Sequence, residues 1–150
     1  MLDILHTSQR KILGCNMSFE FKNPHPKGIK TTDCVVRAIA LALDNDYLET
    51  RRELNRLKRE LGFDRYKENK FVYKYLEDYE RIIIRAEKGK PRVKGYDFIE
   101  LYPKGTYIVS MAGHLSVIED GVLYDLWDCR YRSVYTAWKV KWKLSLFFSI

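Results

Sequence analysis

The dipeptide Asp120-Gly121 constrains the fold of this chain more than any other feature of the sequence. It lies between two stretches rich in apolar residues, where such a dipeptide favours a two-residue type I′ turn. The stretch Leu115–Trp127 is therefore predicted to form a β-hairpin. The turn also sets the register of the hairpin, because a two-residue loop requires Val117 to face Tyr124.

Continuing this register gathers several polar and aromatic side chains on one face of the hairpin. Ser116 is expected to face Asp125, and His114 to face Trp127. Asp125 then lies diagonal to His114, within reach of an imidazole N–H, and Trp127 shields the pair from water. Asp128 falls on the opposite face unless a bulge intervenes. Asp125 is therefore the preferred partner of His114, with Asp128 as the alternative.

A cysteine stands about 80 residues before this histidine, at the start of a predicted helix. Thr32 or Asp33 serves as its N-cap, and the helix runs to Leu43. The helix is apolar nearly all round, so we expect it to be central and buried. A helix N-terminus lowers the pKa of a thiol and offers free backbone N–H groups. Cys34 is therefore a candidate nucleophile, and its own N–H is a candidate donor to an oxyanion.

The rest of the chain places helices before strands. Asp46 and Gly62 mark the two ends of a second helix. Further predicted elements are a helix at 70–79, a short strand at 82–84, one or two helical turns at 96–102, and strands at 106–112 and 134–142. This order predicts an α+β fold with a single domain over 17–150. An N-terminal extension over 1–16 precedes it, and the apolar segment 144–148 is expected to pack against the sheet.

Composition and charge exclude several classes of protein. No apolar run approaches the ~20 residues of a membrane span, and the first residues lack the pattern of a signal peptide, which favours the cytoplasm. Cys15, Cys34 and Cys129 show no CxxC spacing, so neither a disulfide framework nor a zinc ribbon is expected, and no metal or cofactor is predicted. The formal charge of +7 fits a solvated surface better than a nucleic-acid partner, which stays the alternative.

Several segments together resemble the papain-like cysteine peptidase fold. They are Asn23–Gly28, Thr32-Asp33-Cys34, Gly113-His114 and Tyr124–Asp128, and they are similar to those of small uncharacterised papain-like proteins of bacteriophages and Gram-positive bacteria. The resemblance implies a central helix that begins at the cysteine and packs on a C-terminal antiparallel sheet. It also implies a triad of Cys34, His114 and an acidic or amide residue on the next strand, here Asp125.

The implied function is that of a thiol hydrolase, a protease or isopeptidase, or an acyltransferase. It would act on a protein or peptide. For a phage-encoded enzyme, this substrate would be a protein of the bacterial host. Papain-type enzymes place a glutamine before the cysteine as second oxyanion donor, whereas this chain has Gly28 six residues before Cys34. Asn23 or the Thr32 hydroxyl are the candidate replacements.

A binding protein without catalysis is the rival hypothesis. In it, the same scaffold binds a host protein or nucleic acid through its basic surface. Aromatic and basic residues alternate in Arg130–Tyr135 and Trp138–Trp142, as in surfaces that bind single strands. We prefer the interpretation that these stretches form an antiparallel strand with one solvated face.

Overall fold

The computed structural model describes residues 18–140. This part of the chain contains four helices and six strands, in the order β1 (Ser18–Phe21), α2 (Cys34–Leu43), α3 (Tyr47–Leu61), α4 (Asn69–Tyr75), β2 (Glu80–Ile83), α5 (Gly95–Leu101), β3 (Thr106–Met111), β4 (His114–Glu119), β5 (Val122–Asp125) and β6 (Val134–Val140). The α+β class is therefore confirmed. The predicted extension at 1–16 and the apolar segment 144–148 lie outside the described residues.

The six strands form one mixed sheet in the order β1-β5-β4-β3-β6-β2. Its inner pairs are antiparallel, as expected, but β1 lies parallel to β5, with Ser18 opposite Val122. The C-terminal strands pair antiparallel as predicted, but the sheet as a whole is mixed, because the unpredicted strand β1 joins it parallel to β5. A strand of four residues whose partner is about 100 residues away leaves no local signal of its pairing in the sequence.

The hairpin between β4 and β5 has the predicted turn and register. Asp120 and Gly121 both have positive φ, 47° and 80°, as a type I′ turn requires. Val117 lies opposite Tyr124, and this is the last pair before the strands separate. The expected cross-strand pair of His114 and Trp127 is not formed, because β5 ends at Asp125.

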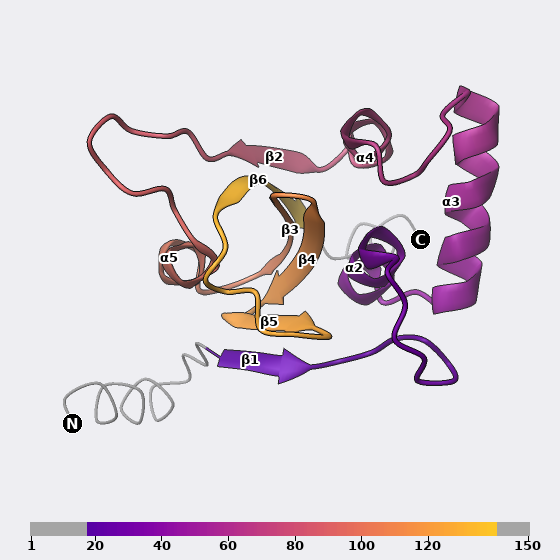
Figure 1. Ribbon diagram of the computed structural model, residues 1–150, viewed down its shortest axis with the longest axis horizontal. Helices are drawn as coiled ribbons and strands as arrows, with labels where there is room; N and C mark the ends of the chain where they lie inside the picture. Colours follow the sequence, from indigo (N-terminus) through magenta and orange to yellow (C-terminus); the bar gives the residue numbers. More distant parts are fainter. Residues whose placement is uncertain (1–17, 141–150) are drawn as a thin grey trace, which may run out of the picture.

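Helix α2 begins at Cys34, as predicted, and all of its first seven residues are buried. It packs against β4 and β3 of the sheet, and α3 covers its outer side, so that α2 lies between the sheet and α3 (Figure 1). Helix α3 has the predicted ends: the Asp46 carboxylate accepts a hydrogen bond from the Glu49 N–H at 3.0 Å, and Gly62 adopts φ 77° after the last turn. The N-terminus of α2 is therefore fixed against the hairpin strand that begins at His114.

The sheet has an apolar core on each face. Residues of α2, α3 and α4 pack on one face around the fully buried Trp138, and α5 covers the other face together with Cys129. Helix α4 ends at Tyr75 rather than at the predicted Tyr79, because the chain turns at Leu76. Of the helices in residues 18–140, none combines the length and apolar character needed to cross a membrane.

Candidate active site

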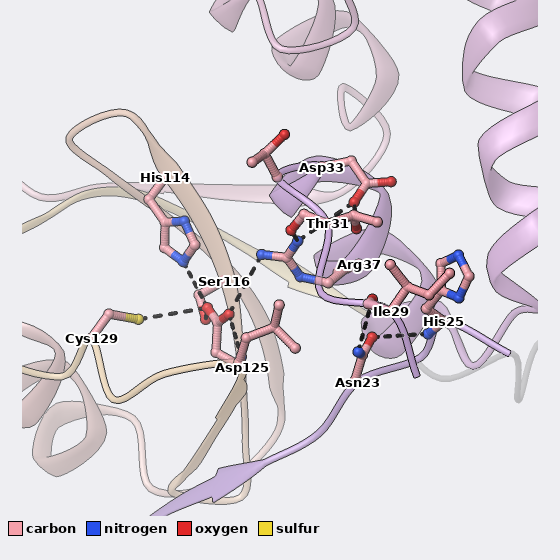
Figure 2. Close-up of polar contacts among 12 residues, drawn as sticks. Asn23, His25, Ile29, Thr31, Asp33, Arg37, His114, Ser116, Asp125 and Cys129 are labelled. Carbon is pink, nitrogen blue, oxygen red and sulfur yellow. Dashed lines mark hydrogen bonds and ion pairs between the residues drawn. The ribbon is translucent and has the colours of Figure 1, made fainter. Parts of the chain in front are cut away.

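The hairpin brings the predicted histidine and aspartate into direct contact. Nε2 of His114, at the first position of β4, lies 2.7 Å from Oδ2 of Asp125, at the last position of β5 (Figure 2). The type I′ turn produces this contact, because it places the two ends of the hairpin side by side. Both side chains are almost completely buried, so water does not screen the interaction.

Asp125 is held by hydrogen bonds on both of its oxygens. Oδ2 also accepts from the Ser116 hydroxyl at 2.7 Å and from the Cys129 thiol at 3.7 Å, while Oδ1 accepts from the Leu126 N–H at 2.7 Å. Burial alone would raise the pKa of the Asp125 carboxyl. The hydrogen bonds from His114 and Ser116 and the charge of His114 outweigh burial and lower this pKa, so Asp125 is a carboxylate.

The Cys34 thiol lines the same cavity as His114, on the helix side of the site. Burial raises the pKa of this thiol, but the hydrogen bond with His114 and a backbone hydrogen bond at Leu115 lower it. The positive charges of His114 and Arg37 act in the same direction. The net result is a pKa below the ordinary value for a thiol, which favours the thiolate.

The imidazole of His114 shows the complementary shift. Burial lowers its pKa, but hydrogen bonds with Asp125, Cys129 and Cys34, together with the charge of Asp125, raise the pKa to about 11. His114 is therefore protonated at neutral pH. Nε2 is directed at Asp125, and the two pKa shifts together favour an imidazolium at His114 and a thiolate at Cys34.

A buried arginine, Arg37, supports this arrangement. It lies one helical turn after Cys34, its Nη2 is 3.8 Å from Oδ1 of Asp125, and its Nη1 is 3.5 Å from Oδ1 of Asp33 (Figure 2). The same guanidinium donates to the Thr31 carbonyl. Sequence analysis missed Arg37, although a single charged residue inside an otherwise apolar helix was a signal that it has a buried partner.

A cavity of about 420 Å³ lies beside Cys34. Cys34 and His114 line it, and the described walls include Lys67 from the α3–α4 connection and Trp127 from the segment after β5. The Trp127 ring centroid is 5.1 Å from that of His114, and the indole is 37% exposed. Trp127 therefore lies beside His114, as expected, but it belongs to the loop after β5 and not to a paired strand.

Two candidate residues lie apart from this group. Asp128 forms hydrogen bonds with Arg130 instead, at 2.9 and 2.8 Å, which leaves Asp125 as the carboxylate in contact with His114. The Asn23 amide is engaged in its own loop: Nδ2 donates to the Ile29 carbonyl, and Oδ1 accepts from the His25 N–H (Figure 2). Asn23 is also not among the described residues that line the cavity.

The backbone N–H of Cys34 is not directed at an empty space. It donates to the Thr32 carbonyl oxygen at 3.1 Å, which corrects the expectation of a free oxyanion donor at this position. The φ and ψ of Asp33, −87° and 64°, are those of an inverse γ-turn, and this tight turn makes the contact. A substrate that used the Cys34 N–H would have to displace the Thr32 carbonyl.

Three side chains of the site could in principle hold a metal ion. His114, Asp125 and Cys129 place potential ligand atoms within 4.8 Å of one another. Such ligands must be deprotonated, whereas Oδ2 of Asp125 accepts the protons of the other two. The contacts are those of a hydrogen-bonded network, and a metal ion would have to displace these protons.

The chain matches no protein-family model, and no curated protein or solved structure matches it. Any assignment of function therefore depends on the geometry and chemistry of the site.

Proposed function

We propose that the protein is a papain-like thiol hydrolase in which Cys34 is the nucleophile, His114 the general acid and base, and Asp125 the residue that orients the imidazole. The observation that carries the proposal is the 2.7 Å contact between His114 and Asp125 next to a thiol of lowered pKa. A thiolate, an imidazolium and an orienting carboxylate in one cavity are the components of nucleophilic catalysis by cysteine.

The proposed reaction is acyl transfer. The Cys34 thiolate attacks the carbonyl carbon of the substrate, and the electron pair of the C=O bond moves to the oxygen. His114 then gives its proton to the leaving group, and a thioester of Cys34 remains. Neutral His114 takes a proton from a water molecule as its oxygen attacks the thioester, the C–S bond breaks, the carboxylic acid product leaves, and the Cys34 thiolate and His114 imidazolium are restored. Throughout, Asp125 holds the proton-bearing Nε2 and stabilises the charged imidazole.

The papain-like assignment and the substrate class are parts of the same proposal. A helix that begins at Cys34 and packs on a sheet that carries the histidine and the acid supports the resemblance. We extend the proposal to the substrate and propose that the enzyme cleaves a peptide or isopeptide bond in a protein. If the enzyme is phage-encoded, this substrate is a protein of the bacterial host. The cytoplasm of the host would then be its location.

Selective alkylation of Cys34 tests the proposed function. The protein is treated with iodoacetamide at pH 6, where an ordinary thiol is almost entirely protonated, and the label is mapped by mass spectrometry. The proposal predicts that Cys34 is labelled at least ten times faster than Cys129, and that His114→Ala abolishes the preference. Absence of labelling, or equal labelling of Cys15, Cys34 and Cys129, contradicts it.

A binding protein is the second candidate function. Tyr131 and Trp127 are exposed, and the Arg132 guanidinium lies 5.4 Å from the Trp127 ring centroid, which is a surface on which a base could stack. The second aromatic stretch gives less support, because Trp138 is buried in the core. Binding of a labelled oligonucleotide that weakens with salt and survives Cys34→Ala would favour this function over hydrolysis.

A further inference from the structure

One carbonyl oxygen next to the nucleophile accepts two hydrogen bonds. The Thr32 oxygen lies 3.1 Å from the backbone N of Cys34 and 2.9 Å from Nζ of Lys67. The donors come from different parts of the chain, since Lys67 belongs to the connection between α3 and α4, 35 residues from Thr32. Thr32, Lys67 and Cys34 all line the same cavity as His114.

The two donors have the chemistry of an oxyanion site. One is the backbone N–H of the nucleophilic residue at a helix N-terminus, and the other is an ammonium group. Lys67 is exposed, and among residues 18–140 it forms no ion pair with a carboxylate. Its charge is therefore available to a negatively charged oxygen that enters the cavity.

We propose that the Thr32 carbonyl occupies the oxyanion position in the free protein, and that Lys67 is the second oxyanion donor, beside the Cys34 N–H. This inference rests on the proposed function of Cys34. Lys67 takes the place of the glutamine that the chain lacks before its cysteine. Asn23, the earlier candidate, is engaged in its own loop.

The Thr32 carbonyl must leave for the substrate oxygen to enter. The tight turn at Asp33 holds it in place, and a change of the Asp33 ψ angle from 64° toward the extended range frees the Cys34 N–H. The cost of this change is offset when the tetrahedral oxygen, with its full negative charge, accepts both hydrogen bonds in place of a neutral carbonyl. The two hydrogen bonds of the site therefore stabilise the charged oxygen of the transition state more than the neutral carbonyl oxygen of the resting state.

Two reagents separate an oxyanion donor from a residue that merely activates the thiol. Iodoacetamide reacts by displacement: the sulfur–carbon bond forms, iodide leaves and no carbonyl oxygen becomes charged. With p-nitrophenyl acetate the thiolate attacks the carbonyl carbon, an oxyanion forms and then collapses, and p-nitrophenolate leaves with an acetyl thioester on Cys34. An oxyanion donor affects only the second reaction.

Lys67→Met is the test variant, and Lys70→Met is its matched control. Lys70 is a neighbouring exposed lysine that is not among the described residues lining the cavity. We expect Lys67→Met to slow acylation by p-nitrophenyl acetate about 10²-fold, the usual effect of losing one oxyanion donor, and to change the iodoacetamide rate less than twofold. Lys67→Arg, which keeps a cationic donor, should recover most of the acylation rate. Lys70→Met should react like the unmodified protein with both reagents.

The outcomes distinguish this inference from the proposed function. If the unmodified protein reacts with neither reagent at Cys34, the proposed function fails. If it reacts with iodoacetamide and Lys67→Met acylates at the unmodified rate, the role of Lys67 fails while the nucleophile stands. If Lys67→Met slows both reactions equally, Lys67 acts on the thiol and not on the oxyanion, which also overturns the inference.

Discussion

Arg37 of α2 and Asp125 of β5 meet across the interface between helix and sheet, with Nη2 3.8 Å from Oδ1. The same guanidinium faces Asp33, so one buried cation serves two buried carboxylates. Asp33 precedes the proposed nucleophile, Cys34, and Asp125 contacts the proposed base, His114. Arg37 therefore connects the two halves of the candidate site, and its charge lowers the pKa of Cys34 as well.

Arg37→Met is expected to destabilise the protein by about 3–5 kcal/mol, because it leaves the buried Asp33 without its cation and Asp125 with His114 alone. The free energy of unfolding is measured by urea titration. Arg56→Met is the matched control: Arg56 pairs with Glu60 at 2.9 Å on the exposed face of α3, and its loss should cost less than about 0.5 kcal/mol. Equal effects of the two substitutions would show that Arg37 has no special place in the fold.

The two aspartates near the end of β5 should differ in their effect on thiol reactivity. Asp125→Asn removes the charge that helps to hold the proton on His114, so the Cys34 pKa rises and alkylation at pH 6 slows by about tenfold or more. Asp128→Asn breaks only the contact with Arg130 and should leave the rate within about twofold. A larger effect at Asp128 would reverse the assignment of the triad acid.

Cys129 is expected to be structural. Its buried thiol donates to Asp125, so Cys129→Ala should lower the free energy of unfolding by about 1.5–3 kcal/mol, the value of a hydrogen bond to a charged group. Cys129→Ser keeps a donor and should lose less. In both variants Cys34 should remain the residue alkylated at pH 6, and loss of that labelling in Cys129→Ser would make Cys129 part of the reactive group.

Local signals in the sequence were sufficient to predict the hairpin and the helices around Cys34. Asp120-Gly121 predicts both the turn and the pairing of Val117 with Tyr124, because the turn type depends on two residues alone. The cap at Asp46 and the stop at Gly62 are likewise decided within one helical turn. The contact between His114 and Asp125 follows from these local rules, and it is the part of the site that the structure reproduces.

Features that depend on tertiary contacts were not predictable from the sequence. The parallel pairing of β1 with β5 needs a partner far along the chain, and the approach of Lys67 to Thr32 depends on how the α3–α4 connection crosses the N-terminus of α2. The contact between the Cys34 N–H and Thr32 depends on one dihedral angle of Asp33. Trp127 reaches His114 from a bend in the chain after β5, which no strand register could describe.

The proposed ion pair between Cys34 and His114 makes the reactivity of the thiol depend on pH. A pKa below the ordinary value of about 8.5 means that the thiolate persists to lower pH than in a free cysteine and disappears as pH falls through that lowered value. Removal of the imidazolium removes two of the causes that lower this pKa, while burial still raises it. In His114→Ala the Cys34 pKa should therefore rise, and the thiolate should form only at higher pH than in the unmodified protein.

The rate of Cys34 alkylation by iodoacetamide as a function of pH, in the unmodified protein and in His114→Ala, tests the central claim most directly. The account predicts a profile that is shifted to lower pH in the unmodified protein than in His114→Ala, with a rate at pH 6 that is about tenfold or more higher in the unmodified protein. Identical profiles that both rise only near pH 8.5 would contradict the thiolate–imidazolium pair and, with it, the proposed hydrolase.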